Sequence, residues 1–314
     1  MWAAGRVARW TGLVGLNYHR IGDGRQSIFD RGLWSATPEA FDEQLAWIKK
    51  NYDVVSPADL PAAKAGRRVI ITFDDGYRDN YTAAFPALQR HGLPATFFVA
   101  TGFIDHPRLP WWDEIAWMVR SSKLTSLTLP GFVPDPVPFD EPDREAAVRK
   151  VLRTFKALPV QRTPALLEAV AAGTGSGRYA GEGVSDLWMT WDMLRAMRDG
   201  GMTIGGHTVS HNVLSTMSAD EQDAEITGCA RRLQEELGAP MTTFSYPVGN
   251  PDSFDGHTRD ALRRVGVKTA FTYYGGHNPA GSVDDYDLRR RAIEQDMTMR
   301  DFQAYVRAPW FTFS

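Results

Sequence analysis

Apolar runs alternate with amphipathic stretches along most of the chain. Residues 69–73 (VIITF) form a β-branched run that is typical of a buried strand, whereas residues 38–51 place Phe41, Leu45 and Ile48 at helical spacing. The same pattern predicts further strands at residues 13–19, 95–100, 202–205, 243–246 and 268–273, and further helices at residues 81–91, 144–158, 193–200, 219–237 and 258–265. Strands that are separated by helices pair in parallel, so the pattern predicts an α/β fold, either a barrel or an open sheet.

Residues 102–187 interrupt this alternation. They contain a proline-rich segment (PGFVPDPVPFDEP) and a glycine-rich stretch (AAGTGSGRYAGEG), which flank the helix predicted at residues 144–158. Long excursions from a compact domain are often lids or binding loops. We therefore interpret this segment as an insertion over one end of the sheet, within a single domain of residues 1–314. A surface elaboration without a role is the alternative.

Composition and charge narrow the class of protein. The net charge of -3 over 314 residues gives no polycationic surface and argues against nucleic acid as a partner. The single cysteine, Cys229, excludes a disulfide within the chain. No stretch approaches the ~20 apolar residues of a membrane span. We expect a soluble, cytoplasmic protein, with the amphipathic start at residues 1–16 as a minor argument for contact with a membrane surface. The sequence does not indicate the oligomeric state.

Two adjacent carboxylates, Asp74 and Asp75, directly follow the strand predicted at residues 69–73. The next residue is Gly76, which permits a tight turn. Because the carboxyl ends of parallel strands form the active-site face of α/β folds, one carboxylate can face a metal and the other a bound water. A pair of turn or helix-capping aspartates is the alternative.

Two histidines, His207 and His211, follow the strand predicted at residues 202–205. They share a face if the segment is helical, or converge across a turn if it is not. Two imidazoles and one carboxylate suit Zn²⁺, with water in an open position. Two unrelated surface or capping histidines are the alternative.

A third strand end is followed by Tyr246, Pro247, Val248 and Gly249. Proline and glycine fix a turn here, and its backbone N–H groups can serve as oxyanion donors. By itself this segment is a weak motif, and an ordinary strand-to-loop turn is the alternative.

The segments TFDDG, HTVSH and FSYPVG, in this order, resemble the motifs of the polysaccharide deacetylase family (NodB-homology domain, carbohydrate esterase family 4). The first two matches are complete and the third is divergent. The resemblance covers residues 13–100 and 190–295. It implies a distorted (β/α)7 barrel of the NodB-homology type with one large inserted segment, and hydrolysis of N-acetyl, sometimes O-acetyl, groups on sugars.

The resemblance also implies a role for each matched residue. Asp75, His207 and His211 would hold a divalent metal, for which zinc is favoured and cobalt, nickel, manganese or iron are alternatives. Asp74 would be the general base that activates the metal-bound water. The backbone N–H of Val248 would help the metal to stabilise the oxyanion.

The chain departs from the family in its third motif, where Ser245 stands in place of an arginine that orients the base. Three consecutive arginines follow at residues 289–291, and period-2 alternation sends Arg290 to the face opposite its neighbours. We interpret Arg290 as the substitute partner of Asp74. A solvated cluster of charges is the alternative.

The chain also lacks the family's C-terminal Leu-x-His element, which commonly supplies the general acid. His19 stands at the end of the strand predicted at residues 13–19, in a Tyr-His element like that of several relatives. Because a barrel is circular, its first strand can supply the position of its last. We assign His19 as the general acid that protonates the leaving amine; a capping or core-edge histidine is the alternative.

Aromatic rings next to carboxylates are reasonable contacts for a sugar. Trp112 and Asp113 in the inserted segment, with Tyr246 and Trp191 outside it, are the candidate substrate contacts. Packing in the core is the alternative for these aromatic residues.

These observations favour a metal-dependent hydrolase that removes acetyl from an N-acetylated sugar of a polysaccharide, a lipid-linked glycan or a glycoconjugate. Two rival hypotheses remain. One is an amidohydrolase acting on a small non-sugar amide. The other is a catalytically silent glycan-binding protein, which the lost arginine of the third motif supports.

Overall fold

A strongly curled parallel sheet forms the centre of the computed structural model, which describes residues 10–60, 66–139, 144–281 and 284–310. Its parallel strands follow one another around the barrel as β13 (Arg290–Ala292), β1 (Gly12–Tyr18), β5 (Arg67–Phe73), β6 (Thr96–Val99), β9 (Thr203–Gly206), β10 (Thr243–Ser245) and β11 (Thr269–Phe271). A parallel bridge between Phe271 and Leu288 joins the end of β11 to the segment before β13. The sheet is therefore a distorted (β/α)7 barrel, which confirms the predicted fold class.

Short strands extend the sheet at its periphery. β4 (Asp53–Val54) pairs in parallel with β5, and β12 (His277–Pro279) pairs antiparallel with β1. A separate parallel pair, β2 (Arg20–Ile21) and β3 (Trp34–Ala36), continues beyond the end of β1. This pair brings the chain between β1 and α1 to the carboxyl end of the barrel.

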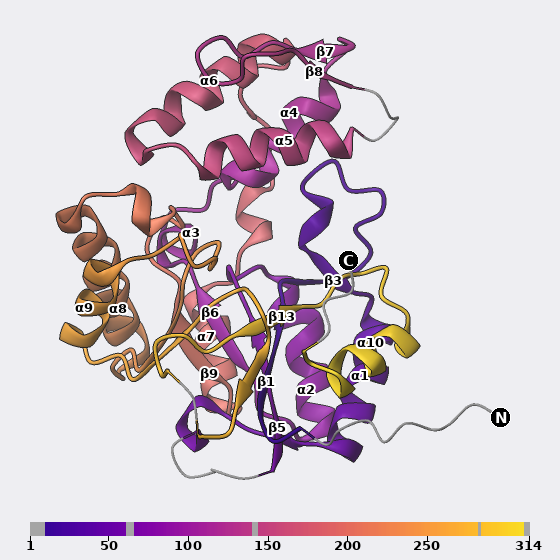
Figure 1. Cartoon of the computed structure of the whole chain (residues 1–314), viewed down its shortest axis with the longest axis vertical. Coiled ribbons are helices and arrows are strands. Elements are labelled where there is room, and N and C mark those ends of the chain that lie inside the picture. The colour runs from indigo at the N-terminus through magenta and orange to yellow at the C-terminus, as the bar shows by residue number, and fades with distance from the viewer. Residues whose placement is uncertain (1–9, 61–65, 140–143, 282–283, 311–314) are drawn as a thin grey trace.

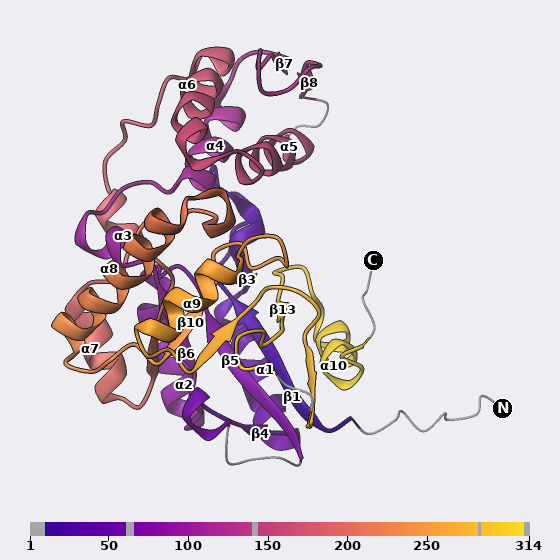
Figure 2. The same ribbon diagram turned by 60° about the vertical axis from the view of Figure 1, so that its left-hand side comes forward.

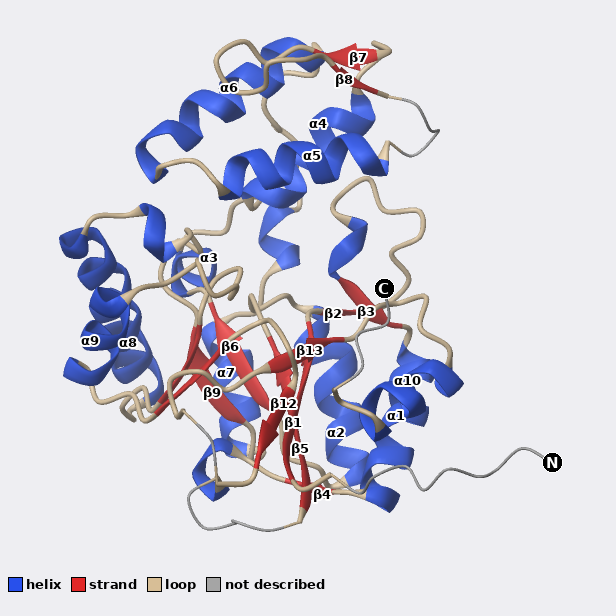
Figure 3. Ribbon diagram, in the orientation of Figure 1, coloured by secondary structure: helices blue, strands red, loops and turns tan. Residues whose placement is uncertain are grey.

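Helices cover the outside of the barrel (Figures 1 and 3). They are α1 (Pro38–Asn51), α2 (Phe85–His91), α3 (Thr101–Asp105), α7 (Trp191–Asp199), α8 (Ala219–Leu237), α9 (Gly256–Arg264) and α10 (Met299–Arg307). Helices α1 and α8 have the predicted bounds because their end signals are strong. Ser218 and Glu221 form a capping box at the start of α8, and Gly238 ends it with a φ of 69°.

Among the described residues, no helix is long and apolar enough to cross a membrane. Residues 1–9, which make up most of the amphipathic start considered above, lie outside the described part of the chain. The cytoplasmic location stays a prediction.

Side chains inside the barrel form two layers. Leu13, Ile70, Phe98, Phe271 and Leu288 make a small apolar cluster, separate from the main core under the helices. Since strand side chains alternate between faces, the next inward positions of β1 and β5 are two residues farther along each strand, toward the carboxyl ends. These positions are Gly15 in β1, which Asn17 follows on the same face, and Thr72 in β5, and the polar Asn17 and Thr72 lead into the candidate active site.

The inserted segment forms a helical unit over the carboxyl ends of the strands, at the top of both views (Figures 1 and 2). It consists of α4 (Trp111–Ser121), β7 (Ser126–Leu127), β8 (Val137–Pro138), α5 (Glu145–Lys156) and α6 (Thr163–Thr174). The sequence pattern predicted α5 but not α4 or α6. These two helices pack against each other, so that burial in the unit stabilises segments whose local pattern is ambiguous.

We predict that Gly15→Ala destabilises the barrel. Gly15 pairs with Arg290, and a Cβ atom there would lie 2.8 Å from the Arg289 carbonyl oxygen and 2.8 Å from the Arg290 Cγ. Forcing β1 and β13 apart should cost about 1–3 kcal/mol of unfolding free energy, measured by chemical denaturation. Gly256→Ala is the matched control, because an added Cβ there meets nothing within 4 Å. Equal stability of the two variants would contradict the prediction.

Candidate active site

Loops at the carboxyl ends of the strands enclose a cavity of about 310 Å³. They are the loops that follow β1, β5, β9, β10 and β11, and helix α5 and the start of α4 close the cavity on the side of the insertion. The lining residues are His19, Asp30, Gly32, Leu33, Asp74, Asp75, Trp111, Trp112, Arg149, Leu152, Lys156, His207, His211, Tyr246, Val248, Asn250 and Tyr273. The segments that carry all three sequence motifs therefore meet in one place.

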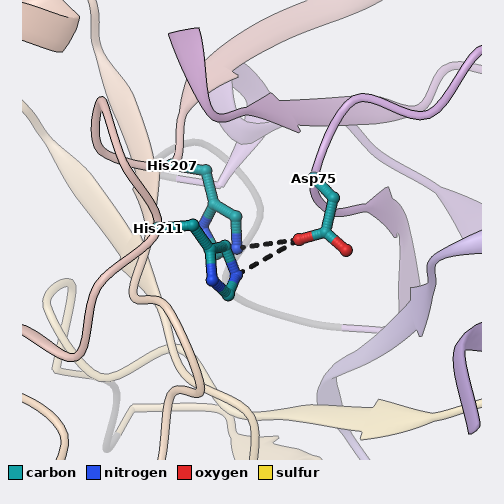
Figure 4. A group of neighbouring side chains, drawn as sticks. All are labelled: Asp75, His207 and His211. Carbon is teal, nitrogen blue, oxygen red and sulfur yellow. Dashed lines mark ion pairs between the residues drawn. The ribbon is translucent and has the colours of Figure 1, made fainter. Parts of the chain in front are cut away.

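Asp75, His207 and His211 point toward one another in this cavity (Figure 4). The Asp75 Oδ1 lies 3.5 Å from the His207 Nε2 and 3.2 Å from the His211 Nε2. All three side chains are buried. Ligand atoms bound 2.0–2.2 Å from one ion at tetrahedral angles lie about 3.4 Å apart, so the spacing is that of a metal site.

The chemistry of the three atoms also fits a cation. The His207 Nδ1 lies 2.7 Å from the Ser245 carbonyl oxygen, which can only accept, so Nδ1 carries a proton and the lone pair of the neutral form of the ring is on Nε2, facing Asp75. Within the described residues, the buried Asp75 Oδ1 has no hydrogen-bond partner. Acceptors that converge without a donor are costly when buried, and a divalent metal ion would satisfy them.

The electrostatics of the cluster attract positive charge. Burial acts to raise the pKa of Asp75, but the neighbouring His207 and His211 outweigh it and hold the pKa far below its ordinary value. Burial acts to lower the pKa of His207, and here Asp74 and Asp75 outweigh it and raise the pKa. Burial lowers the pKa of His211, which favours the neutral imidazole that a metal requires.

The backbone is strained where these residues are held. Asp75, Thr208, His211 and Val248 have φ values of 77°, 66°, 58° and 65°, and Arg144 is the one other non-glycine residue with positive φ in the described ranges. Such conformations cost about 1–3 kcal/mol each and persist where the surrounding structure enforces them. Their clustering marks the cavity as a functional site.

Residues 207–211 form a turn, which decides between the two conformations that the sequence left open. The Glu225 Oε2 accepts from the backbone N–H groups of Val209 and Ser210, at 2.9 and 2.8 Å. The N–H of His211 donates to the Thr208 Oγ1 at 2.9 Å. These bonds replace the helical ladder and bring both imidazoles to one side.

Arg290 reaches Asp74 through the interior of the barrel. Its Nη1 lies 2.8 Å from the Asp74 Oδ1 and its Nη2 lies 2.8 Å from the Asp74 Oδ2. The guanidinium also donates to the Thr272 carbonyl and to the side chains of Asn17, Thr72 and Ser245. With 1% of its surface exposed, Arg290 is no part of a solvated cluster.

This pairing keeps Asp74 ionised. Burial acts to raise the pKa of Asp74, but the charge of Arg290 and then that of His207 lower it below its ordinary value. The carboxylate therefore stands beside Asp75 and the two histidines in its proton-accepting form. The neighbouring Ser245, which replaces the expected arginine, contributes a hydroxyl 3.3 Å from the Asp74 Oδ2.

His19 lies directly after β1, and its ring lines the same cavity. Its backbone is fixed on both sides, since the N–H donates to the Ser35 Oγ at 3.0 Å and the carbonyl accepts from the Asn80 Nδ2 at 2.7 Å. The ring meets the edge of Tyr273, with 5.8 Å between centroids. Its role as general acid stays a prediction, as does the oxyanion role of Val248, which also lines the cavity.

Two of the four candidate substrate contacts line the cavity. The Trp112 ring lies 4.4 Å from that of His211, and its Nε1 donates to the Tyr77 hydroxyl at 2.8 Å. Tyr246 donates its hydroxyl to the Tyr286 carbonyl at 3.0 Å, so only its ring is available.

The structure does not bring the other two candidates into the cavity. Asp113 is fully buried and accepts from the Tyr77 hydroxyl and from the Asp30 backbone N–H; burial raises its pKa to about 7. Trp191 lies in α7, where its Nε1 donates to Asp105 at 2.8 Å and its ring faces the guanidinium of Arg232. Both side chains have structural partners that the sequence pattern could not indicate.

The sequence analysis missed several cavity residues. Next to the cavity lining, Asn17 donates to the Asp74 Oδ2 at 3.2 Å, and period-2 alternation back from His19 could have indicated it. Asp30, Arg149 and Lys156 carried no local signal, since they reach the cavity from a loop and from the insertion.

The fold and the site define a barrel hydrolase with an Asp-His-His cluster at the carboxyl ends of its strands, and comparisons identify its family. The family model described as polysaccharide deacetylase matches residues 62–124 and 137–270, more than half of the chain. The chain therefore belongs to the polysaccharide deacetylase family.

Individual relatives agree with this assignment. The poly-beta-1,6-N-acetyl-D-glucosamine N-deacetylase of Escherichia coli (strain K12) is 34% identical over 103 residues, which are 31% of this chain and only 15% of that protein. The Bacillus subtilis (strain 168) protein YxkH is 21% identical over 305 residues, 93% of this chain and 75% of that protein.

Solved structures share the fold. The Streptococcus pyogenes deacetylase PplD in complex with acetate has a TM-score of 0.61 at 20% identity, covering 93% of this chain and 96% of that one. IcaB from Ammonifex degensii has a TM-score of 0.58 at 17% identity, covering 96% of this chain and 99% of that one.

We predict that Arg290→Met destabilises the protein most at neutral pH. Without Arg290, burial would raise the pKa of Asp74, so the charged carboxylate would be favoured less in the folded than in the unfolded state. The loss of unfolding free energy should reach about 3–5 kcal/mol at pH 7 and shrink toward pH 4 as Asp74 is protonated. Denaturant unfolding across this pH range measures it.

Arg289→Met is the control for this prediction, because the Arg289 side chain is 48% exposed on the other face of the strand. It should change stability by less than about 0.5 kcal/mol. A loss for Arg290→Met that does not vary with pH would mean that the ion pair with Asp74 is not the cause.

Proposed function

We propose that this protein is a metal-dependent N-deacetylase that hydrolyses the acetamido group of an N-acetylated sugar. One observation carries the proposal: the acceptor atoms of Asp75, His207 and His211 lie within 4.8 Å of one another, in the cavity that Asp74 and His19 also line. The sugar belongs to a polysaccharide, a lipid-linked glycan or a glycoconjugate.

Asp75, His207 and His211 would hold the ion, and two nitrogens with one oxygen favour zinc among the divalent metals. When bound, the ion supplies a Lewis acid that polarises the acetyl carbonyl and acidifies water.

Asp74 is the general base in this proposal. It takes a proton from the attacking water, and the fork of Arg290 holds its carboxylate in one orientation. A rigid, already ionised acceptor needs no reorganisation at the moment of reaction. Because the positive charge of Arg290 lowers the pKa of Asp74, Asp74 also releases this proton readily afterwards.

His19 is the general acid. It lies on the cavity wall formed by β1, and donates a proton to the nitrogen of the sugar as the C–N bond breaks. The backbone N–H of Val248, held at positive φ, is the donor toward the oxyanion. The products are acetate and a free amine on the sugar.

The relatives support an N-acetyl substrate. The Escherichia coli relative is named for the removal of acetyl from poly-N-acetylglucosamine, and the structure of PplD contains acetate, the product that this reaction would release. The silent glycan-binding alternative loses its main support, because Arg290 now contacts Asp74 in place of the missing arginine of the third motif.

Acetate release tests the proposal. Zinc-loaded protein should release acetate from N-acetylglucosamine oligomers and lose this activity on chelation, and the panel includes O-acetylated sugars and small non-sugar amides. Acetate from the non-sugar amides alone would favour the rival amidohydrolase. No acetate from any compound would contradict both enzymatic hypotheses.

Two substitutions separate the metal from the base. Asp75→Ala should lose the bound zinc, measured by elemental analysis, together with activity. Asp74→Asn should keep the zinc and lose about 10²- to 10⁴-fold in kcat, the usual contribution of a general base. His257→Gln, at an exposed position on α9, should change neither. Normal kcat in Asp74→Asn would remove Asp74 from the mechanism.

A further inference from the structure

One face of the inserted helix α5 forms a wall of the active-site cavity. Arg149, Leu152 and Lys156 are spaced three and four residues apart, which places them on the same side of the helix, and all three line the cavity. Two of the three are cations. The insertion therefore brings positive charge to the place where the substrate must sit.

Lys156 has no counter-ion of its own. Its ammonium lies 6.0 Å from the centroid of the Trp111 ring, and the described residues contain no ion pair within 4.0 Å and no hydrogen bond to it. Burial lowers the pKa of Lys156, against the attraction of Asp30 and Asp75. The side chain is half-buried and its ammonium keeps its hydrogen-bonding capacity, so it can bind an anion that enters the cavity.

The other charges of the cavity are already used. Asp74 forms an ion pair with Arg290, and the carboxylate of Asp75 would bind the metal ion. Asp30 accepts from the backbone N–H of Gly32 at 2.9 Å and is the remaining carboxylate of the lining. Arg149 lies 3.9 Å from Glu145, so Lys156 is the cation of this face of α5 that forms no ion pair within 4.0 Å among the described residues.

A neighbouring hollow narrows down where in the cavity an anion could bind. Gly32 and Arg149 also line a second hollow of about 580 Å³, so the cavity continues past α5. Three positive and three negative side chains line that hollow, so its charges balance. They are Arg25, Arg31 and Arg149, and Glu145, Glu294 and Asp296. Arg149 is shared with that hollow, so Lys156 is the α5 cation that faces the first cavity alone.

We propose that Lys156 forms an anion subsite, and that the substrate carries a phosphate or carboxylate on the sugar that is deacetylated or on the bond next to it. The proposal rests on the deacetylase function for the identity of the sugar. The ammonium contacts the anion while the acetamido group faces Asp74 and the metal ligands. Lys156 thereby selects acidic glycans over neutral ones.

Binding measurements test this subsite separately from catalysis. In a zinc-loaded Asp74→Asn background, which suppresses turnover, calorimetry would compare methyl N-acetylglucosaminide (neutral), N-acetylglucosamine 1-phosphate and 6-phosphate, and N-acetylmuramic acid (a carboxylate). At least one anionic sugar should bind about 10- to 100-fold more tightly than the neutral one, the range of a charged hydrogen bond. The phosphate and carboxylate arms identify which anion is preferred.

Variants on α5 assign the preference to one side chain. Adding Lys156→Met should bring the ratio of the two dissociation constants close to one, and Lys156→Arg should keep the preference. Lys150→Met is the matched control on the same helix, at an exposed position outside the cavity, and should leave the ratio unchanged.

Two outcomes would overturn the subsite: equal binding of neutral and anionic sugars, or a preference that survives Lys156→Met and so comes from the metal. Failure of the deacetylase function is a different result, because it appears as missing acetate in the wild-type assay whatever the binding ratio is.

Discussion

The ion pair between Arg290 and Asp74 connects the architecture of the barrel to its chemistry. Arg290 comes from the last barrel strand and Asp74 from the end of β5, with β1 between them. Removing two charges from water costs several kcal/mol per ion. The fold tolerates this pair because all three nitrogens of the guanidinium donate hydrogen bonds to buried acceptors. Below it lie the rings of Phe98 and Phe271, 5.5 and 5.9 Å from the guanidinium carbon.

The same pair influences the neighbouring cluster of Asp75, His207 and His211. With Asp74 held ionised by Arg290, Asp75 and the two histidines stand in a region of negative potential that attracts a cation. Strained backbone at Asp75 and His211 aims the ligands inward. The strain persists because the hydrogen bonds of Glu225 and the packing of the barrel leave the loops no other conformation.

The insertion completes the site from the other side. Trp112 packs against His211 and Lys156 lines the cavity, so the insertion contacts the Asp-His-His cluster and also forms one wall of the cavity. The barrel supplies the groups of the proposed reaction, whereas the insertion supplies the contacts that would choose the substrate. The three sequence motifs lie in the barrel, but the family match extends over residues 102–124 and 137–187 of the insertion as well.

The sequence by itself determined six of the seven parallel barrel strands, most barrel helices and the chemical groups at the strand ends, because these depend on local periodicity and on short motifs. It also placed Arg290 opposite its two neighbours, but only the register of β13 on β1 decided that this face is the barrel interior. Asp113 accepts a hydrogen bond in a buried network and Trp191 donates one to Asp105, whereas Lys156 of the insertion lines the cavity. These outcomes depend on contacts between residues far apart in the chain, which the three-dimensional packing alone decides.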